Sequence, residues 1–140
     1  MNDTTDAEAA AQEMDVSGVR VLVVDDADTV RRVMESRLVG LGCDVRVADG
    51  GFPALSLMRE FDAEIVFLDI SMPDLDGYKT CAVIRNRHPE LPIVMLSSHD
   101  GIFDIAEGMV HGATEHVTKS PGPDRLREIV YRLCRAGTIA

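Results

Sequence analysis

Short apolar runs rich in β-branched residues alternate along the chain with stretches of helical periodicity. Residues 21–24, 65–68 and 93–96 are apolar throughout, and residues 114–117 form a weaker run. Residues 44–48 alternate apolar and polar side chains, as a strand with one exposed face does. Uninterrupted apolar runs are typical of parallel strands covered on both faces. The pattern therefore predicts five strands.

Between these runs, apolar residues recur at helical spacing. Five helices are expected, marked in turn by Val30, Val33, Met34, Leu38 and Leu41; Leu55, Met58 and Phe61; Tyr78, Cys81 and Ala82; Ile102, Ile105, Ala106 and Met109; and Leu126, Ile129, Val130 and Leu133. Strands that alternate with helices indicate the α/β class, a doubly wound (βα)5 fold with helices on both faces of one parallel sheet.

Charge separates a leader from this pattern. The chain of 140 residues has a net charge of −10, which disfavours nucleic acid as a partner because phosphate contacts need basic side chains. Residues 1–18 carry five acidic residues and no basic one, and they include no long apolar run. We expect this segment to be a disordered tail, with a short amphipathic helix as the alternative, and residues 19–137 to form one domain.

The cysteines and the apolar runs indicate the redox compartment and whether the chain associates with a membrane. Cys43, Cys81 and Cys134 are odd in number and have no metal-ligand spacing, so we expect free thiols, buried or half-buried, in a reducing cytoplasm. The apolar runs are too short to span a bilayer, and no membrane association is predicted.

Acidic side chains follow two of the predicted strands. Asp25 and Asp26 come directly after residues 21–24, and Asp69 follows residues 65–68. The carboxyl ends of parallel strands meet at one edge of a sheet, where such folds bind ligands. Clustered carboxylates repel one another unless a cation neutralises them, and Mg²⁺ takes carboxylate oxygens, water and phosphate oxygens as ligands. Alternatively, the Asp25–Asp26 pair merely caps a helix or marks a turn.

Two further polar residues follow predicted strands. Ser97 comes after residues 93–96, and Lys119 follows Val117 and Thr118. An aspartate can form a covalent phosphoryl adduct, whose charge an ammonium and a hydroxyl could stabilise. Taken alone, each of these two residues could equally be solvated surface. Their shared position favours transfer of a phosphoryl group to Asp69.

Together these motifs resemble the receiver domain of two-component response regulators: Asp25–Asp26, Asp69 followed by Met72–Pro73 and Gly77, then Ser97 and Lys119. The resemblance implies a flavodoxin-like sheet of strand order 2-1-3-4-5 and Asp69 as phospho-acceptor. It also implies an Mg²⁺ site formed by Asp26, Asp69 and the Ser71 backbone carbonyl, with Asp25 acting through a bound water. Lys119 would contact the phosphoryl group, and Ser97 would be the switch hydroxyl.

The runs 76–82 and 95–104 are similar to those of stand-alone, chemotaxis-type regulators of type IV pilus twitching motility. This similarity implies a chemotaxis-type sensor histidine kinase as phosphodonor and a pilus motor or scaffold protein as output partner. We therefore interpret the chain as a response regulator, not an enzyme. Three alternatives stay open: a phosphate sink for the same kinase, an interaction module that is not phosphorylated, and an aspartyl phosphatase. The phosphatase is disfavoured because Ser71 stands where a second carboxylate is needed.

Three residues depart from the receiver pattern. Lys119 is followed by Ser120 where receivers have a proline after a cis bond, and a cis bond before serine costs roughly 3–4 kcal/mol. We therefore predict that this bond is trans and that Lys119 still reaches the site. His116 replaces a bulky aromatic residue and is read as a structural side chain, with a pH-sensitive switch as the alternative. His99 lies where side chains control access of water to the phosphoryl group.

Overall fold

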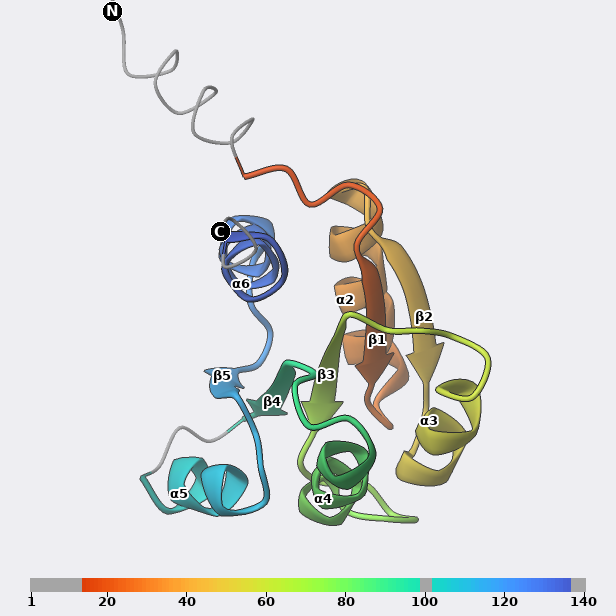
Figure 1. The fold of residues 1–140 in the computed structure, drawn as a ribbon, viewed down its shortest axis with the longest axis vertical. Helices are drawn as coiled ribbons and strands as arrows, with labels where there is room; N and C mark the ends of the chain where they lie inside the picture. The colour runs from red at the N-terminus through yellow and green to blue at the C-terminus, as the bar shows by residue number, and fades with distance from the viewer. Residues whose placement is uncertain (1–13, 99–101, 137–140) are drawn as a thin grey trace, which may run out of the picture.

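The computed structural model describes residues 14–98 and 102–136. The strands are β1 (Arg20–Val24), β2 (Asp44–Ala48), β3 (Ile65–Asp69), β4 (Ile93–Ser97) and β5 (Glu115–Thr118). The helices are α2 (Asp28–Gly40), α3 (Gly51–Leu57), α4 (Gly77–Arg87), α5 (Ile102–Val110) and α6 (Pro123–Cys134). Strands and helices alternate along the chain, as the sequence predicts (Figure 1).

The five strands form one parallel sheet in the order β2-β1-β3-β4-β5. The predicted (βα)5 fold and strand order are therefore confirmed. The chain runs outward from β1 to β2 on one side and to β3, β4 and β5 on the other, so the strand order reverses beside β1. The carboxyl ends of β1 and β3 flank this switch point, where open α/β sheets bind ligands.

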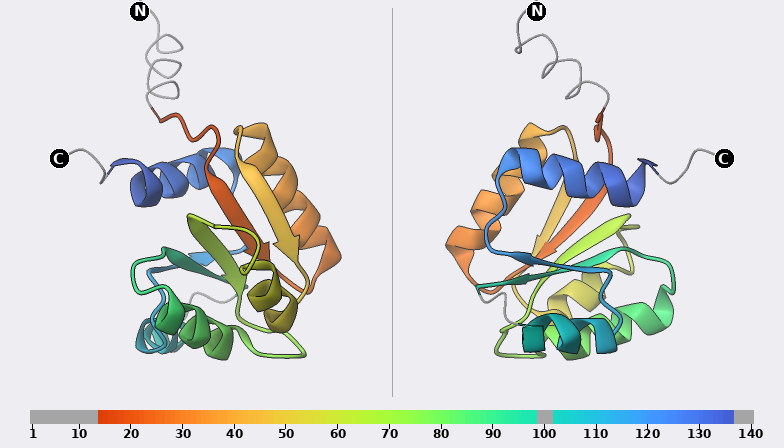
Figure 2. Two further views of the ribbon diagram at one scale, coloured as in Figure 1. Left: turned by 45° about the vertical axis from the view of Figure 1, so that its right-hand side comes forward. Right: turned by 90° about the vertical axis from the view of Figure 1, so that its left-hand side faces the viewer.

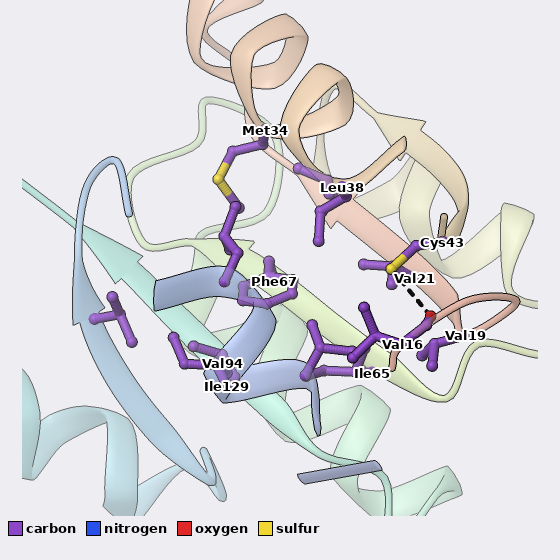
Figure 3. Close-up of a cluster of buried hydrophobic side chains, with 14 of the residues drawn as sticks. Val16, Val19, Val21, Met34, Leu38, Cys43, Ile65, Phe67, Val94 and Ile129 are labelled. Carbon is purple, nitrogen blue, oxygen red and sulfur yellow. Dashed lines mark hydrogen bonds between the residues drawn. The ribbon is translucent and has the colours of Figure 1, made fainter. Parts of the chain in front are cut away.

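Helices cover both faces of the sheet. Helices α2 and α6 lie on one face, and α3, α4 and α5 lie on the other (Figure 2). The first face holds a buried cluster that includes Met34, Phe67 and Ile129 (Figure 3). The second face holds another, which includes Leu68, Met95 and Ile84. Both clusters take residues from β1, β3 and β4, which is why these strands are apolar throughout.

The domain's packed part begins before residue 19. Val16 is 1% exposed and belongs to the first cluster, and the Val16 carbonyl accepts hydrogen bonds from the Val19 amide and the Cys43 thiol. The predicted disordered tail otherwise falls on residues 1–13, which lie outside the described part of the chain. Burial raises the pKa of the Cys43 and Cys81 thiols to about 11, as expected of inert free thiols.

Two predicted apolar helix faces differ from the structure. Helix α3 ends at Leu57, and Phe61, which was expected to mark its last turn, is buried in the connection to β3. On α5, Ile105 and Met109 are 41% and 56% exposed instead of packing inward, and the neighbouring Val110 is 81% exposed. Periodicity locates an apolar face but cannot say whether another element covers it. None of the helices within residues 14–98 and 102–136 is long and apolar enough to cross a membrane.

Candidate phosphorylation and metal site

Three carboxylates meet at the switch point of the sheet. Asp69 is the last residue of β3, and Asp25 and Asp26 directly follow β1, the neighbouring strand. One carboxylate oxygen of each lies within 4.8 Å of one from each of the others. Asp25 and Asp69 are buried, whereas Asp26 is exposed. The three aspartates that follow predicted strands in the sequence therefore meet in the structure.

Hydrogen bonds hold Asp25 in place. Its Oδ1 accepts the Ala27 amide at 2.9 Å, and its backbone carbonyl accepts the Arg31 guanidinium at 2.8 Å. Ala27 is the N-cap residue of α2, and its side chain makes no cap hydrogen bond. Arg31 is not among the residues that the sequence pattern singled out, although it contacts the site. No local motif identifies such a contact, because it depends on how the strand-to-helix turn folds back.

Lys119 enters the carboxylate cluster. Its Nζ lies 2.8 Å from Asp69 Oδ1 and 3.0 Å from Asp25 Oδ2, and its amide donates to the Ser97 carbonyl at 2.8 Å. The prediction that Lys119 reaches the site is confirmed. The prediction of a trans bond is wrong, because the Lys119–Ser120 peptide is cis.

The site changes the protonation of its own groups. Desolvation raises the pKa of Asp69 to about 6; Lys119 works against this shift, and the charge of Asp25 adds to it. Burial works to lower the pKa of Lys119, but its contacts with Asp69 and Asp25 outweigh burial, so the pKa is raised. Lys119 is therefore a cation near neutral pH, while Asp69 is a carboxylate that is costly to ionise.

The carboxyl end of β4 and the loop after β3 complete the site. Ser97, the last residue of β4, is buried at 6% exposure. The Ser71 amide lies 3.4 Å from Asp69 Oδ1, a long hydrogen bond. The loop closes where the Gly77 amide donates to the Ile70 carbonyl at 2.7 Å. A Cβ at Gly77 would collide with the Asp69 carbonyl, so this close approach requires glycine.

The residues present fit a hard divalent cation. Asp25 Oδ2 is buried and faces the Lys119 ammonium at 3.0 Å. Three carboxylates whose oxygens lie within 4.8 Å of one another form a donor set that suits Mg²⁺ and its bound waters. Beside Asp26, Ser71 and Pro73 lies an open hollow of about 490 Å³. A small phosphodonor could approach the carboxylates from it.

The histidines singled out by the sequence have different outcomes. His116 lies in β5 opposite Met95, and neither of its buried ring nitrogens has a hydrogen-bond partner among the described residues. His99 lies outside the described residues. The Tyr78 ring packs near that of His111, with ring centroids 5.4 Å apart, at the edge of the second cluster.

In a comparison with known proteins, residues 21–131 match the response regulator receiver domain family. The chain belongs to that family. It is 45% identical over 109 residues to the protein PilG of Pseudomonas aeruginosa, covering 76% of this chain and 81% of PilG. It is 34% identical to a probable transcriptional regulator ycf27 of Porphyridium aerugineum, of which it spans about half, 51%.

Solved receiver structures have the same fold. The chemotaxis protein CheY4 of Vibrio cholerae superimposes with a TM-score of 0.79 at 26% identity, covering 84% of this chain and 99% of CheY4. A putative response regulator from Chloroflexus aurantiacus gives 0.79 at 31% identity, with coverages of 84% and 98%. As a receiver, the chain is a phospho-acceptor in two-component signalling rather than a catalytic enzyme.

Proposed function

We propose that this protein is a stand-alone response regulator that accepts a phosphoryl group from a histidine kinase on Asp69. One observation carries the proposal: Asp25, Asp26, Asp69 and the Lys119 ammonium converge at the carboxyl ends of β1, β3 and β5. A carboxylate nucleophile, a set of hard oxygen ligands and a fixed cation are the parts that phosphoryl transfer to an aspartate needs.

The proposed chemistry assigns a task to each residue. An Asp69 carboxylate oxygen bonds to phosphorus while the bond from phosphorus to the kinase histidine nitrogen breaks. Asp26, Asp69 and the Ser71 carbonyl would hold Mg²⁺, with Asp25 acting through water, and the bound ion would offset the charge of the phosphoryl oxygens. Lys119, already 2.8 Å from Asp69, would pair with one of those oxygens. The Ser97 hydroxyl would donate to another.

The proposed output is a change in protein binding. Ile105, Met109 and Val110 place three exposed apolar side chains on one short helix, and α5 packs beside β5, the strand that leads to Lys119. Exposed apolar side chains that gather on one element mark interaction sites. Movement of Ser97 and Lys119 toward a phosphoryl group would therefore act on the surface formed by α5, β5 and α6. This surface favours a messenger over a phosphate sink.

Similarity to PilG supports a role in type IV pilus twitching motility. In this role a chemotaxis-type histidine kinase would be the phosphodonor, a pilus motor or scaffold protein would be the output partner, and the protein would act in the cytoplasm. No contact with nucleic acid or membrane is part of the proposal.

Intact-mass spectrometry after incubation with acetyl phosphate tests the assignment of Asp69. We expect one phosphoryl adduct with Mg²⁺, none in EDTA and none in Asp69→Asn. Asp62→Asn is a matched control, because the Asp62 side chain is 95% exposed and lies in the loop before β3, and it should react like the wild type. An adduct on Asp69→Asn at wild-type yield would remove the assignment.

A further inference from the structure

The carboxylate of Asp74 joins the loop after β3 to a different helix. This loop, residues 70–76, connects Asp69 to α4. Asp74 Oδ1 accepts the Gly51 amide at 3.1 Å, and Asp74 Oδ2 accepts the Phe52 amide at 3.0 Å. These are the first two residues of α3, whose amides have no partner within their own helix. A side chain more than 20 residues away therefore caps α3.

The start of α3 is shaped to receive this carboxylate. Its N-cap residue, Gly50, has an extended backbone and makes no side-chain cap. A Cβ at Gly50 would lie 2.7 Å from Asp74 Oδ2 and 2.9 Å from Oδ1, closer than side-chain contacts allow. The backbone of Gly50 would tolerate alanine, so the obstacle is the Asp74 carboxylate itself. The glycine leaves room for the carboxylate to reach both amides.

The electrostatics keep the contact in place. Hydrogen bonds from the Phe52 and Leu75 amides, together with that from Gly51, hold the pKa of the exposed Asp74 carboxyl below its usual range. The two backbone amides of α3 thus favour the ionised form of Asp74. Its negative charge also faces the positive end of the α3 dipole.

The same loop lies against the phosphorylation site at its other end. The Ser71 amide reaches Asp69 Oδ1, and the Gly77 amide closes the loop on the Ile70 carbonyl. Ser71 and Pro73 line the hollow beside Asp26. The backbone of Ser71, three residues before Asp74, faces the carboxylates. A shift of the loop at Asp74 would therefore also move the Ser71 backbone.

We propose that Asp74 is a positioning residue of the phosphorylation site, holding loop 70–76 against α3 so that the Ser71 carbonyl is placed for Mg²⁺. The inference rests on the proposed function, because it takes Ser71 as an Mg²⁺ ligand. It predicts that the affinity for Mg²⁺ depends on a contact made outside the carboxylate cluster. Groups that orient metal ligands commonly alter affinity by about tenfold or more when removed.

Calorimetric titration of the full chain with MgCl2 tests the inference directly. Asp74→Ala should raise the Mg²⁺ dissociation constant about tenfold. Asp74→Asn keeps one of two acceptors and should fall between this variant and the wild type. Gly50→Ala is the matched second variant: it retains Asp74 but displaces its carboxylate, and so should weaken Mg²⁺ binding as Asp74→Ala does.

Asp15→Ala is the control, because Asp15 also accepts a backbone amide, from Ser17 at 2.9 Å, but lies before β1, at the opposite edge of the sheet from the site. It should leave Mg²⁺ binding unchanged. In the acetyl phosphate reaction, the variants should rank in the same order. Weaker Mg²⁺ binding should appear as a higher half-saturating Mg²⁺ concentration, with an unchanged maximal rate. Circular dichroism checks that each variant is folded.

The outcomes separate the two proposals. If folded Asp74→Ala and Gly50→Ala bind Mg²⁺ as the wild type does, Asp74 is only a helix cap and the inference is overturned, even if their melting temperatures fall. If the wild type binds Mg²⁺ but gains no phosphoryl group, the proposed function fails. The calorimetric ranking then still decides whether Asp74 positions the metal site.

Discussion

Replacement of Asp69 by asparagine is expected to stabilise the metal-free protein at pH 8. Asp69 is 3% exposed and faces Asp25, so its ionised form is disfavoured even with Lys119 at 2.8 Å. Asparagine has nearly the same shape and carries no charge. The residue proposed as phospho-acceptor thus lowers the free energy of unfolding until a cation binds.

The magnitude follows from the raised pKa. Asp69 has an ordinary pKa of 3.8 and a folded-state value of about 6. Each pKa unit corresponds to about 1.4 kcal/mol, so ionised Asp69 lowers the free energy of unfolding by up to about 3 kcal/mol at pH 8. Because asparagine makes a weaker contact with Lys119, we expect Asp69→Asn to gain about 1–3 kcal/mol.

The pH dependence gives the prediction its sign. Folded protein holds the Asp69 proton more tightly than unfolded protein, so its stabilising contribution is complete below pH 3.8 and is lost as pH rises to about 6. The stability difference between Asp69→Asn and the wild type should therefore be near zero at the acid end of this window. It should grow across the window and stay constant at higher pH.

Urea unfolding followed by circular dichroism in EDTA, at several pH values between 4 and 8, measures this difference. The exposed Asp62→Asn serves as control and should change stability by less than about 0.5 kcal/mol. Added MgCl2 should stabilise the wild type more than Asp69→Asn, because the folded wild type offers Mg²⁺ one more carboxylate ligand. A metal-free Asp69→Asn protein that is no more stable than the wild type at pH 8 would refute the reasoning.

Three further changes test other parts of the site. Asp26→Ala should weaken Mg²⁺ binding in calorimetry more than Asp25→Ala, because only Asp26 is proposed as a direct ligand; equal losses would contradict this assignment. Lys119→Ala should raise the pKa of Asp69 above about 6 in an NMR titration, since its hydrogen bond and charge now oppose the shift, and an unchanged value would be inconsistent with the ion pair. His116→Phe should leave stability unchanged or raise it by about 1 kcal/mol in urea unfolding, because it removes two buried ring nitrogens that have no hydrogen-bond partner within residues 14–98 and 102–136. A loss above about 1 kcal/mol would contradict this expectation.

The sequence was sufficient for the fold because each element has a strong period. The apolar strands β1, β3 and β4 are buried on both faces, and the alternating β2 lies at an edge of the sheet. The site follows by one further step, since parallel strands place their carboxyl ends together. The side chains of Asp25, Asp69 and Lys119 therefore meet although more than 90 residues separate the first from the last.

The errors arise where the outcome depends on contacts between distant segments. Met109 has the spacing of a core residue but is 56% exposed. The capping of α3 by Asp74 joins residues from different elements, and neither has a local signature. The cis Lys119–Ser120 peptide was likewise not predicted from the sequence.

The position of Lys119 links the energetics of the site to its proposed output. In the metal-free protein its ammonium lies between Asp25 and Asp69, where it offsets part of their repulsion. A phosphoryl group on Asp69 would offer a stronger anion at the same place and would draw the ammonium toward it. Lys119 follows β5 directly, and β5 packs beside α5, whose Ile105, Met109 and Val110 are exposed. The negative charge of Asp69, which lowers the stability of the metal-free protein, also holds Lys119. Through Lys119 and β5, a change of charge at Asp69 would reach the exposed surface of α5.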